Sequence, residues 1–283
     1  MKNRNYSTKK KIKKCLLYVL TIFLVCIFFY PIFTAIITSL KTNQEISQSV
    51  MALPQKLNFE NYVAAMKRSD FMQALINTCT VTFPSVVLIV ICGSMGGYAI
   101  ARNSNRKKSF RWLDKIYLAS LMLPFQIMMV PIYKIYKTLH LQNSLFGMIL
   151  ILTGTSIAYA TFMYVGFVKS IPREIEEAAE IDGCGPYKLF FQVVFPLLKP
   201  VTATVAALHV MWLWNDFNIA LIILQKEEVR TLTVKQYYFF GQYTTEYGIA
   251  FASAISSMIP VLLFFLLVQK YLIEGVAAGA VKN

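Results

Sequence analysis

Charged residues are scarce in this sequence, and acidic residues are the scarcest of them. Only 15% of the 283 residues are charged, and Asp and Glu together number 14 against 28 Lys and Arg. Soluble domains carry about 25% charged residues, so a soluble globular protein is not expected. Hydrophobic residues make up 57% of the chain, which excludes intrinsic disorder as well. In a soluble protein the net charge of +14 would indicate a nucleic-acid partner. Here we interpret it as the charge bias of a membrane protein and expect no nucleic acid.

The sequence also lacks the motifs of several catalytic and metal-binding classes. It has no Gly-x4-Gly-Lys-[Ser/Thr] phosphate-binding loop and no Gly-Lys dipeptide, so any ATP hydrolysis must be performed by another polypeptide. Its five cysteines form no Cys-x-x-Cys pair, and His140 and His209 are isolated. We therefore expect no catalytic residue, no metal site and no cofactor bound by this chain.

Long apolar runs are what the sequence has instead. A helix needs about 20 apolar residues to cross a bilayer, and six runs reach or approach this length, one of them interrupted only by Asp216. We predict an all-α polytopic membrane protein with six transmembrane helices. The runs are 15–40, 71–101, 116–133, 138–168, 200–225 and 247–269.

The distribution of Lys and Arg orients these helices. With both termini in the cytoplasm, the cytoplasmic segments hold 19 of the 28 Lys and Arg residues, as the positive-inside rule requires. The basic stretch 9–14 resembles the start of a signal peptide, but the apolar run after it is too long, so we interpret it as a retained anchor. The prediction is a multi-pass protein of the cell (plasma or inner) membrane. Its predicted parts are a cytoplasmic tail (1–14), a first transmembrane helix (15–40), an extracytoplasmic loop (41–70) with helical patterning around Phe59–Met66, a five-helix core (71–271) that contains the loop 169–199, and a cytoplasmic tail (272–283).

The loop 169–199 differs from the other loops because it is acidic and patterned as a helix. Its acids are Glu174, Glu176, Glu177, Glu180 and Asp182. Ser170 as N-cap, Pro172 in the first turn and acids near the N-terminus predict a helix that ends at Gly183. Gly185-Pro186 predicts a turn followed by a second short helix over 187–192. We call residues 170–196 the acidic segment.

One face of the first predicted helix has the features of a docking surface. Ile175, Ala178, Ala179 and Asp182 fall at i, i+3, i+4 and i+7, which places them on one face. Small residues flanked by carboxylates fit a groove on a cytoplasmic protein. The alternative is a helix that lies on the lipid surface. Anionic lipid attracts basic faces rather than acidic ones, so the docking interpretation is favoured.

The spacing within the acidic segment resembles a known motif. Glu177-Ala178-Ala179 is followed after three residues by Gly183, after nine more by Val193, and then by Phe195-Pro196. This resembles the EAA loop of binding-protein-dependent ABC importer permeases, whose pattern is Glu-Ala-Ala-x3-Gly-x9-Ile-x-Leu-Pro. The chain departs from it with Val193 for Ile and Phe195 for Leu, and both departures stay apolar.

The resemblance implies a fold, a set of partners and roles for particular residues. The fold would be the type I ABC importer permease fold. The expected partners are a second homologous permease, two ATP-binding subunits that carry ATP and Mg²⁺, an extracytoplasmic solute-binding protein, and membrane lipid. Glu177 would meet a basic residue of an ATP-binding subunit, and Gly183 would let the helix seat against it. The implied coupling residues are Ile175, Glu177, Ala178, Ala179, Asp182, Gly183 and Pro196.

Further segments resemble the carbohydrate-uptake branch, and within it the smaller permease of maltose-type transporters. They are the stretch from Ser170 to Ala179, Trp214-Asn215-Asp216-Phe217, Arg230 to Val234, and the stretch from Gly275 to Lys282. The resemblance implies a permease for sugars or oligosaccharides. A glycerol-phosphate or polyol importer is the alternative within this class, and an ion-coupled secondary transporter or a membrane scaffold is the alternative outside it.

Two groups of residues are candidates for contact with the sugar or with the binding protein. Trp212, Asn215 and Asp216 fall at i, i+3 and i+4 in the predicted helix 200–225, where an aromatic face beside polar groups suits a sugar. Interfacial anchoring and a structural hydrogen bond are the alternative roles for this group. The outer loop 225–248 resembles a loop that reaches into the binding protein in the relatives, although an interfacial aromatic belt is equally compatible with it. Its candidate residues are Tyr237, Tyr238, Gly241, Gln242 and Tyr243.

Overall fold

A computed structural model of the chain describes residues 2–242 and 246–280, and the side chains of residues 13–238 and 246–269. All regular structure in the described residues is helical. The chain divides into two compact units, one formed by Met1–Ser69 with Tyr238–Ser256 and the other by Asp70–Tyr237 with Ser257–Asn283.

The first unit contains the long helix α1 (Lys2–Ser39) and the short helices α2 (Asn43–Gln48) and α3 (Glu60–Arg68). Thr42 and Glu45 form a capping box at the start of α2, which satisfies backbone donors that have no partner within the helix. The side-chain amide of Asn61 in α3 donates to the carbonyls of Ser39 and Lys41, both at 2.8 Å. These bonds join α3 to the end of α1. The helical patterning that the sequence showed around Phe59–Met66 is confirmed by α3.

The second unit contains most of the helices. They are α4 (Phe71–Asn103), α5 (Lys108–Ser120), α6 (Phe125–Thr138), α7 (Leu145–Val168), α8 (Glu174–Ile181), α9 (Pro186–Lys188), the π-helix η1 (Leu189–Val194), α10 (Phe195–Leu197), α11 (Lys199–Trp214), α12 (Asn218–Ile223) and the 3₁₀-helix η2 (Glu227–Val229). The helices α13 (Leu232–Gln242) and α14 (Tyr247–Ala280) contain residues of both units.

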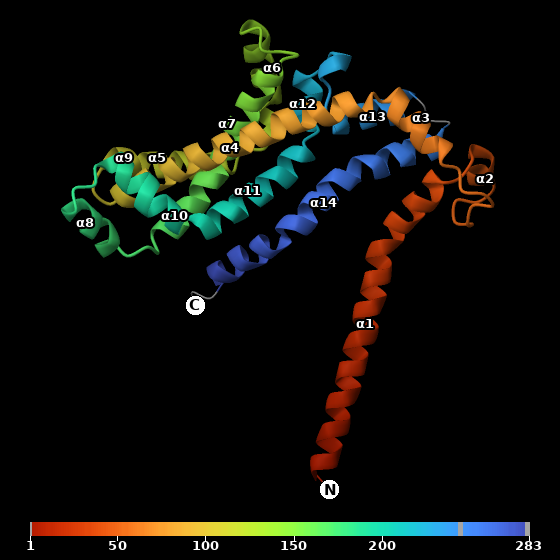
Figure 1. The fold of residues 1–283 in the computed structure, drawn as a ribbon, viewed down its shortest axis with the longest axis horizontal. Coiled ribbons are helices and arrows are strands. Elements are labelled where there is room, and N and C mark those ends of the chain that lie inside the picture. Colours follow the sequence, from red (N-terminus) through yellow and green to blue (C-terminus); the bar gives the residue numbers. More distant parts are fainter. Residues whose placement is uncertain (1, 243–245, 281–283) are drawn as a thin grey trace. The chain divides into compact units, whose positions relative to one another are not determined.

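The helices α4 and α7 form the packed centre of the second unit, and Figure 1 shows them running side by side. Glycines make their close approach possible. A Cβ on Gly93 would lie 2.9 Å from the Cβ of Ala160, and a Cβ on Gly97 would lie 2.5 Å from the Cβ of Tyr164. Small residues allow transmembrane helices to come this close. Tyr164 is itself fully buried.

Within the part of the chain that the structure describes, four helices are long and apolar enough to cross a membrane: Lys13–Ser39 of α1, α4, α7 and Tyr247–Gln269 of α14. Two bent pairs raise the number to six if each pair counts as one span. The pairs are α5 with α6, bent by 104°, and Pro186–Leu197 with α11, bent by 76°. The expected number of six is therefore reached only with these two bent pairs, and four of the spans are single helices.

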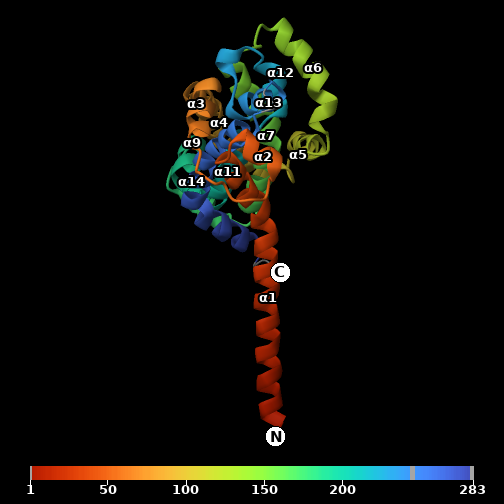
Figure 2. The same ribbon diagram turned by 90° about the vertical axis from the view of Figure 1, so that its right-hand side faces the viewer.

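The prediction of one helix over 116–133 is wrong, because the chain breaks between Ser120 and Phe125. Figure 2 shows α6 turning away from α5 at this break. Pro124 stands at the N-cap of α6. Proline lacks a backbone N–H and disfavours helical geometry at the residue before it, so the helix stops ahead of Pro124.

The prediction of one helix over 200–225 is also wrong, because α11 ends at Trp214 and α12 begins at Asn218. The side-chain amide of Asn215 donates to the carbonyl of Met211 at 2.8 Å, and the carboxylate of Asp216 accepts from the amide of Ala220 at 3.0 Å. Short polar side chains that bond to the backbone in this way favour helix ends over helix interiors.

Candidate functional site

The first helix of the acidic segment is α8. Ser170 does not cap it: the hydroxyl of Ser170 donates to the carbonyl of Phe167 at 2.7 Å, and the N-cap position is Arg173, without a side-chain cap. Ser170 instead closes the end of α7. Three acidic residues in the first turn, Glu174, Glu176 and Glu177, supply the negative charge that the positive end of a helix favours. The expectation of a Ser170 cap is corrected, while the expected helix is present.

The end of α8 is the turn that the sequence predicted. Gly183 has φ +81°, a left-handed conformation that glycine adopts without steric cost. The amide of Gly183 donates to the carbonyl of Glu180, and the amide of Cys184 donates to the carbonyl of Ala179, both at 3.0 Å. These two bonds are those of a Schellman motif.

The second helix of the acidic segment begins at Pro186, as the Gly-Pro turn predicted, and it extends further than the expected residue 192. It runs through α9, η1 and α10 to Leu197. Pro196 lies in α10, at the C-terminal end of this continuous run. The ring of Phe190 is buried and packs 5.0 Å from the ring of Phe191 and 6.0 Å from the ring of Phe195.

The face predicted for docking is only partly exposed. Ile175, Ala178 and Asp182 are exposed, but Ala179 is buried. The placement of Ala179 on the docking face is therefore corrected: it packs inside the chain. The most exposed apolar residues nearby are Ile181, at 86%, and Tyr187, at 76%, and the sequence analysis had assigned neither of them to a surface. Glu177 is also exposed, so the outer side of α8 joins acidic and apolar side chains.

The inner side of α8 carries an interaction that the sequence analysis missed. The hydroxyl of Tyr98 donates to Oε2 of Glu176 at 2.8 Å, and Nε of Arg102 donates to Oε1 of Glu176 at 2.8 Å. Tyr98 and Arg102 belong to the last turns of α4. The Arg102–Glu176 ion pair is largely buried, with side chains 12% and 10% exposed. Glu176 and Ala179 are three residues apart, and that spacing was the local sign that they share the inward face.

A hollow of about 250 Å³ lies where α8 meets the end of α4. Basic and acidic side chains both line it, so its field has no single sign. The lining residues are Tyr98, Arg102, Asn103, Arg106, Arg173, Glu176, Glu177 and Glu180.

The residues predicted to line a substrate path do not share one helix face. Trp212 lies on α11, while Asn215 and Asp216 lie in the break that follows it. Asp216 makes two hydrogen bonds within the protein. Its carboxylate accepts from the amide of Ala220, and its backbone carbonyl accepts from the hydroxyl of Thr233 at 2.7 Å. The shared face is therefore corrected. Trp212 is 50% exposed, and its ring lies 5.0 Å from the ring of Tyr159.

The predicted outer loop 225–248 is largely helical, because it contains η2 and α13. Tyr237 is exposed and packs its ring 5.0 Å from that of Phe217, and Tyr238 is half-buried. Gly241 and Gln242 close α13, and nothing is described of their side chains. Tyr243 lies outside the described residues.

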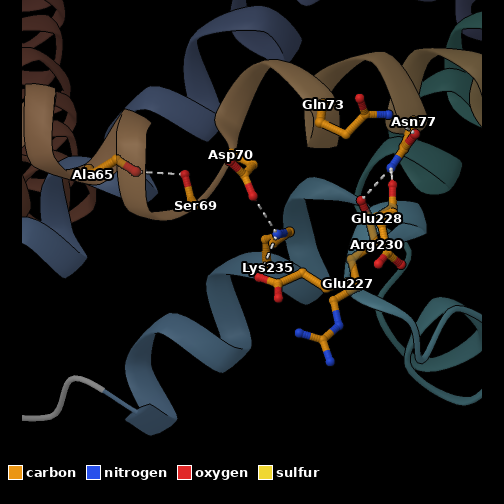
Figure 3. A network of polar contacts seen from close by, with 9 residues as sticks. All are labelled: Ala65, Ser69, Asp70, Gln73, Asn77, Glu227, Glu228, Arg230 and Lys235. Atoms are coloured by element: carbon orange, nitrogen blue, oxygen red, sulfur yellow. Dashed lines mark hydrogen bonds and ion pairs between the residues drawn. The ribbon is translucent and has the colours of Figure 1, made fainter.

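Residues at the start of the segment 225–248 bind to the beginning of α4, as Figure 3 shows. The side-chain amide of Asn77 donates to the backbone carbonyls of Glu228 and Arg230 at 2.8 and 3.0 Å. The buried ammonium group of Lys235 lies 3.0 Å from Glu227 and 3.5 Å from Asp70. Lys235 is the main cause of a pKa of Glu227 below its usual value, through a hydrogen bond and its charge.

Comparison with known proteins decides the family. Residues 93–277 match the family of binding-protein-dependent transport system inner membrane components. The chain belongs to this family. The matched residues include the whole acidic segment, and this permease is a multi-pass membrane protein.

Curated relatives resemble the permease over nearly its whole length. The probable starch degradation products transport system permease AmyC of Thermoanaerobacterium thermosulfurigenes is 32% identical, over 97% of this chain and 99% of its own. The melibiose/raffinose/stachyose import permease MelC of Bacillus subtilis is 36% identical, over 91% of this chain and 93% of its own.

Among solved structures, the permease resembles a bacterial ABC transporter involved in the import of the acidic polysaccharide alginate. The match has a TM-score of 0.79 and 25% identity, and it covers 92% of this chain and 96% of that one. The type I ABC importer permease fold expected from the EAA-like spacing is thereby confirmed.

Among the described residues, no group of three or more His, Cys, Asp and Glu side chains could hold a metal ion.

Proposed function

We propose that the permease is one of two pore-forming subunits of an ATP-driven importer of sugars or oligosaccharides. The relatives' names support the substrate class, because they include starch degradation products, raffinose-type sugars and arabinooligosaccharides. The observation that carries the coupling role is the acidic segment, a folded two-helix unit with an exposed acidic and apolar outer side.

The outer side of α8 is the proposed contact with an ATP-binding subunit. Ile181 and, in the adjoining α9, Tyr187 are 86% and 76% exposed, and exposed apolar patches mark interaction sites. Glu177 adds a carboxylate that a basic side chain in a groove can pair with. The partner subunit carries ATP and Mg²⁺ and supplies the energy, while this chain binds no cofactor.

This contact requires the acidic segment to face the cytoplasm. The bias of Lys and Arg toward the segments on that side supports such an orientation. In this orientation both termini also lie in the cytoplasm. The complete importer then comprises this chain, a second homologous permease, two ATP-binding subunits and an extracytoplasmic binding protein, all within or beside membrane lipid. The segment 225–248 faces the binding protein.

For the substrate, the exposed ring of Trp212 is the best supported of the path candidates. Tyr159 and His209 pack against this ring with centroid distances of 5.0 and 5.3 Å and hold it in place. An ordered aromatic ring can stack on the apolar face of a sugar. Asn215 and Asp216, in contrast, shape the break between α11 and α12 through their backbone bonds.

The test of the coupling role uses the tagged chain purified from its own membranes. We expect an ATP-hydrolysing companion to co-purify with the wild type. Glu177→Gln removes one charged hydrogen-bond partner, worth about 1.5–3 kcal/mol, so the amount of companion retained falls about tenfold or more. Ile181→Ser removes apolar contact and has the same direction of effect.

Glu60→Gln is the matched control, because it makes the same chemical change at an exposed acid of α3, outside the acidic segment. It is expected to retain the companion. The proposal is contradicted if the wild type has no nucleotide-hydrolysing companion, or if labelling of intact cells finds α8 exposed outside.

For the substrate class, cells are given labelled raffinose, maltotriose and arabinotriose. If the wild type takes up none of these sugars, the proposal of a carbohydrate importer is contradicted.

A further inference from the structure

Glu176 differs from the other acids of α8 because it points into the protein. Its side chain is 10% exposed, while Glu174, Glu177 and Glu180 are exposed. Burying a carboxylate is costly unless the charge is paired and hydrogen-bonded. Its inward position therefore requires partners from elsewhere in the chain.

Those partners come from the end of one long helix, α4. One oxygen of Glu176 accepts from Tyr98 and the other from the guanidinium group of Arg102, which contacts it through both Nε and a terminal nitrogen. The two oxygens are thus engaged from different directions. Paired, charge-assisted hydrogen bonds of this kind fix geometry as well as adding stability, so α8 has a defined position and rotation relative to α4.

The same end of α4 also holds the chain just before α8. A terminal nitrogen of Arg102 donates to the carbonyl of Ile171 at 3.1 Å, and the guanidinium group of Arg173 donates to the carbonyl of Arg102 at 3.0 Å. The connection between α7 and α8 is therefore tied to α4 at two points. It cannot extend or turn without breaking bonds to that helix.

Tyr98 extends this attachment to the second helix of the acidic segment. Its ring lies 5.5 Å from the ring of Phe190 in η1, and Phe190 is buried. One tyrosine thus contacts α8 through its hydroxyl and η1 through its ring. Both halves of the acidic segment rest on the last turns of α4.

We propose that Glu176, held by Tyr98 and Arg102, is a positioning residue that makes α8 move as one body with α4. A displacement of the acidic segment by an ATP-binding subunit then reaches the packed α4–α7 centre. Without this attachment, the displacement reaches α4 only through the bonds that Arg102 and Arg173 make in the connection 169–173. The inference rests on the proposed function, since it concerns how the force enters the chain after docking has occurred.

The test separates docking from transmission. The tagged importer is purified with its own partners and placed in vesicles. Three quantities are measured: the amount of ATP-binding subunit retained per permease, the rate of ATP hydrolysis, and the number of sugar molecules transported per ATP hydrolysed. The sugar used is whichever of raffinose, maltotriose and arabinotriose the wild type accumulates most. The variants are Glu176→Gln, which keeps shape and removes charge, and Tyr98→Phe, which removes one hydroxyl. Glu60→Gln, outside the acidic segment, is the matched control.

We expect Glu176→Gln to retain the ATP-binding subunit within twofold of the wild type and to lower the sugar transported per ATP at least tenfold. Tyr98→Phe has a smaller effect, about threefold, because the guanidinium contacts remain. Glu60→Gln behaves as the wild type. A purely structural role would instead lower the yield of assembled importer while leaving the ratio of sugar to ATP unchanged.

The outcomes distinguish this inference from the proposed function. If the wild type neither retains an ATP-binding subunit nor transports sugar, the proposed function fails. If the wild type transports and Glu176→Gln keeps the same ratio, the positioning role is wrong. Loss of the ATP-binding subunit from Glu176→Gln would assign the residue to docking, which also overturns the inference. If Glu176→Gln does not assemble, an unchanged ratio in Tyr98→Phe overturns it.

Discussion

Gly97 in α4 faces Tyr164 in α7 so closely that an added Cβ would lie 2.5 Å from the Cβ of the tyrosine. Tyr164 is completely buried and its hydroxyl lies 3.0 Å from that of Thr202 in α11. The ring therefore has no free space to move into, and any added atom at residue 97 must separate the two helices.

The first prediction concerns this contact. Gly97→Ala should lower the free energy of unfolding by about 1–3 kcal/mol, the usual cost of overpacking a tight contact. Thermal unfolding of the purified protein in detergent measures the change. Gly96→Ala is the control, because the nearest atom to its added Cβ lies at 3.7 Å, an ordinary contact distance. Equal melting temperatures for the two variants would show that the α4–α7 approach is looser than described.

The second prediction concerns the turn after α8. Gly183→Ala should destabilise the end of this helix by about 1–2 kcal/mol, because a side chain disfavours the left-handed conformation. Hydrogen–deuterium exchange at the amide of Cys184, which donates to the carbonyl of Ala179, should become faster. Gly183→Asn should be milder, because asparagine tolerates this conformation better.

Gly185→Ala provides the comparison for that turn. Gly185 has φ −67°, and neither glycine has an atom within 4 Å of an added Cβ. The two substitutions therefore differ in backbone conformation and not in available space. Faster exchange in both variants would mean that the positive φ is not the cause.

The third prediction concerns pH and the ion pairs of Lys235. The pKa of Glu227 lies below its ordinary value of 4.5 because Lys235 donates a hydrogen bond to it and attracts its charge. A carboxyl group whose pKa is lowered by folding stabilises the protein above its unfolded pKa, and this contribution is lost as the pH falls through the folded pKa. Lys235→Met should therefore lower the melting temperature at pH 7, with a difference from the wild type that narrows below about pH 4.

Lys226→Met is the control for this measurement, since Lys226 is an exposed lysine of the same segment. Its melting temperature should follow that of the wild type at every pH. A Lys235→Met protein whose deficit stayed constant from pH 7 to pH 3 would attribute the effect to packing of the lysine stem and not to its charge.

The parts of the candidate site that the sequence predicted are those fixed by local chemistry. Gly183 and the Gly185-Pro186 pair predict their turns, because glycine permits backbone conformations that other residues avoid and proline restricts them. The EAA-like spacing reached the correct family for the same reason, since it is written within one short stretch of chain. The six apolar segments were also visible, because a bilayer demands long runs of apolar residues.

The parts that the sequence did not predict depend on distant partners or on side chains that compete with the helix. The pairing of Glu176 with Arg102 joins residues 74 positions apart, and no local pattern specifies it. Asn215 and Asp216 were interpreted as a polar face within a helix, whereas their side chains bind the backbone and accompany the end of α11. Ala179 was assigned outward because helix periodicity gives faces but does not say which face meets the core.

The Schellman turn at Gly183 has a consequence for how this permease would meet the ATP-binding subunit proposed above. Because backbone bonds inside the chain fix the end of α8, this turn need not be ordered during the encounter. Association then loses less conformational entropy than the docking of an unstructured loop would. Recognition of this preformed turn requires only rigid-body approach, which favours rapid assembly of the proposed importer.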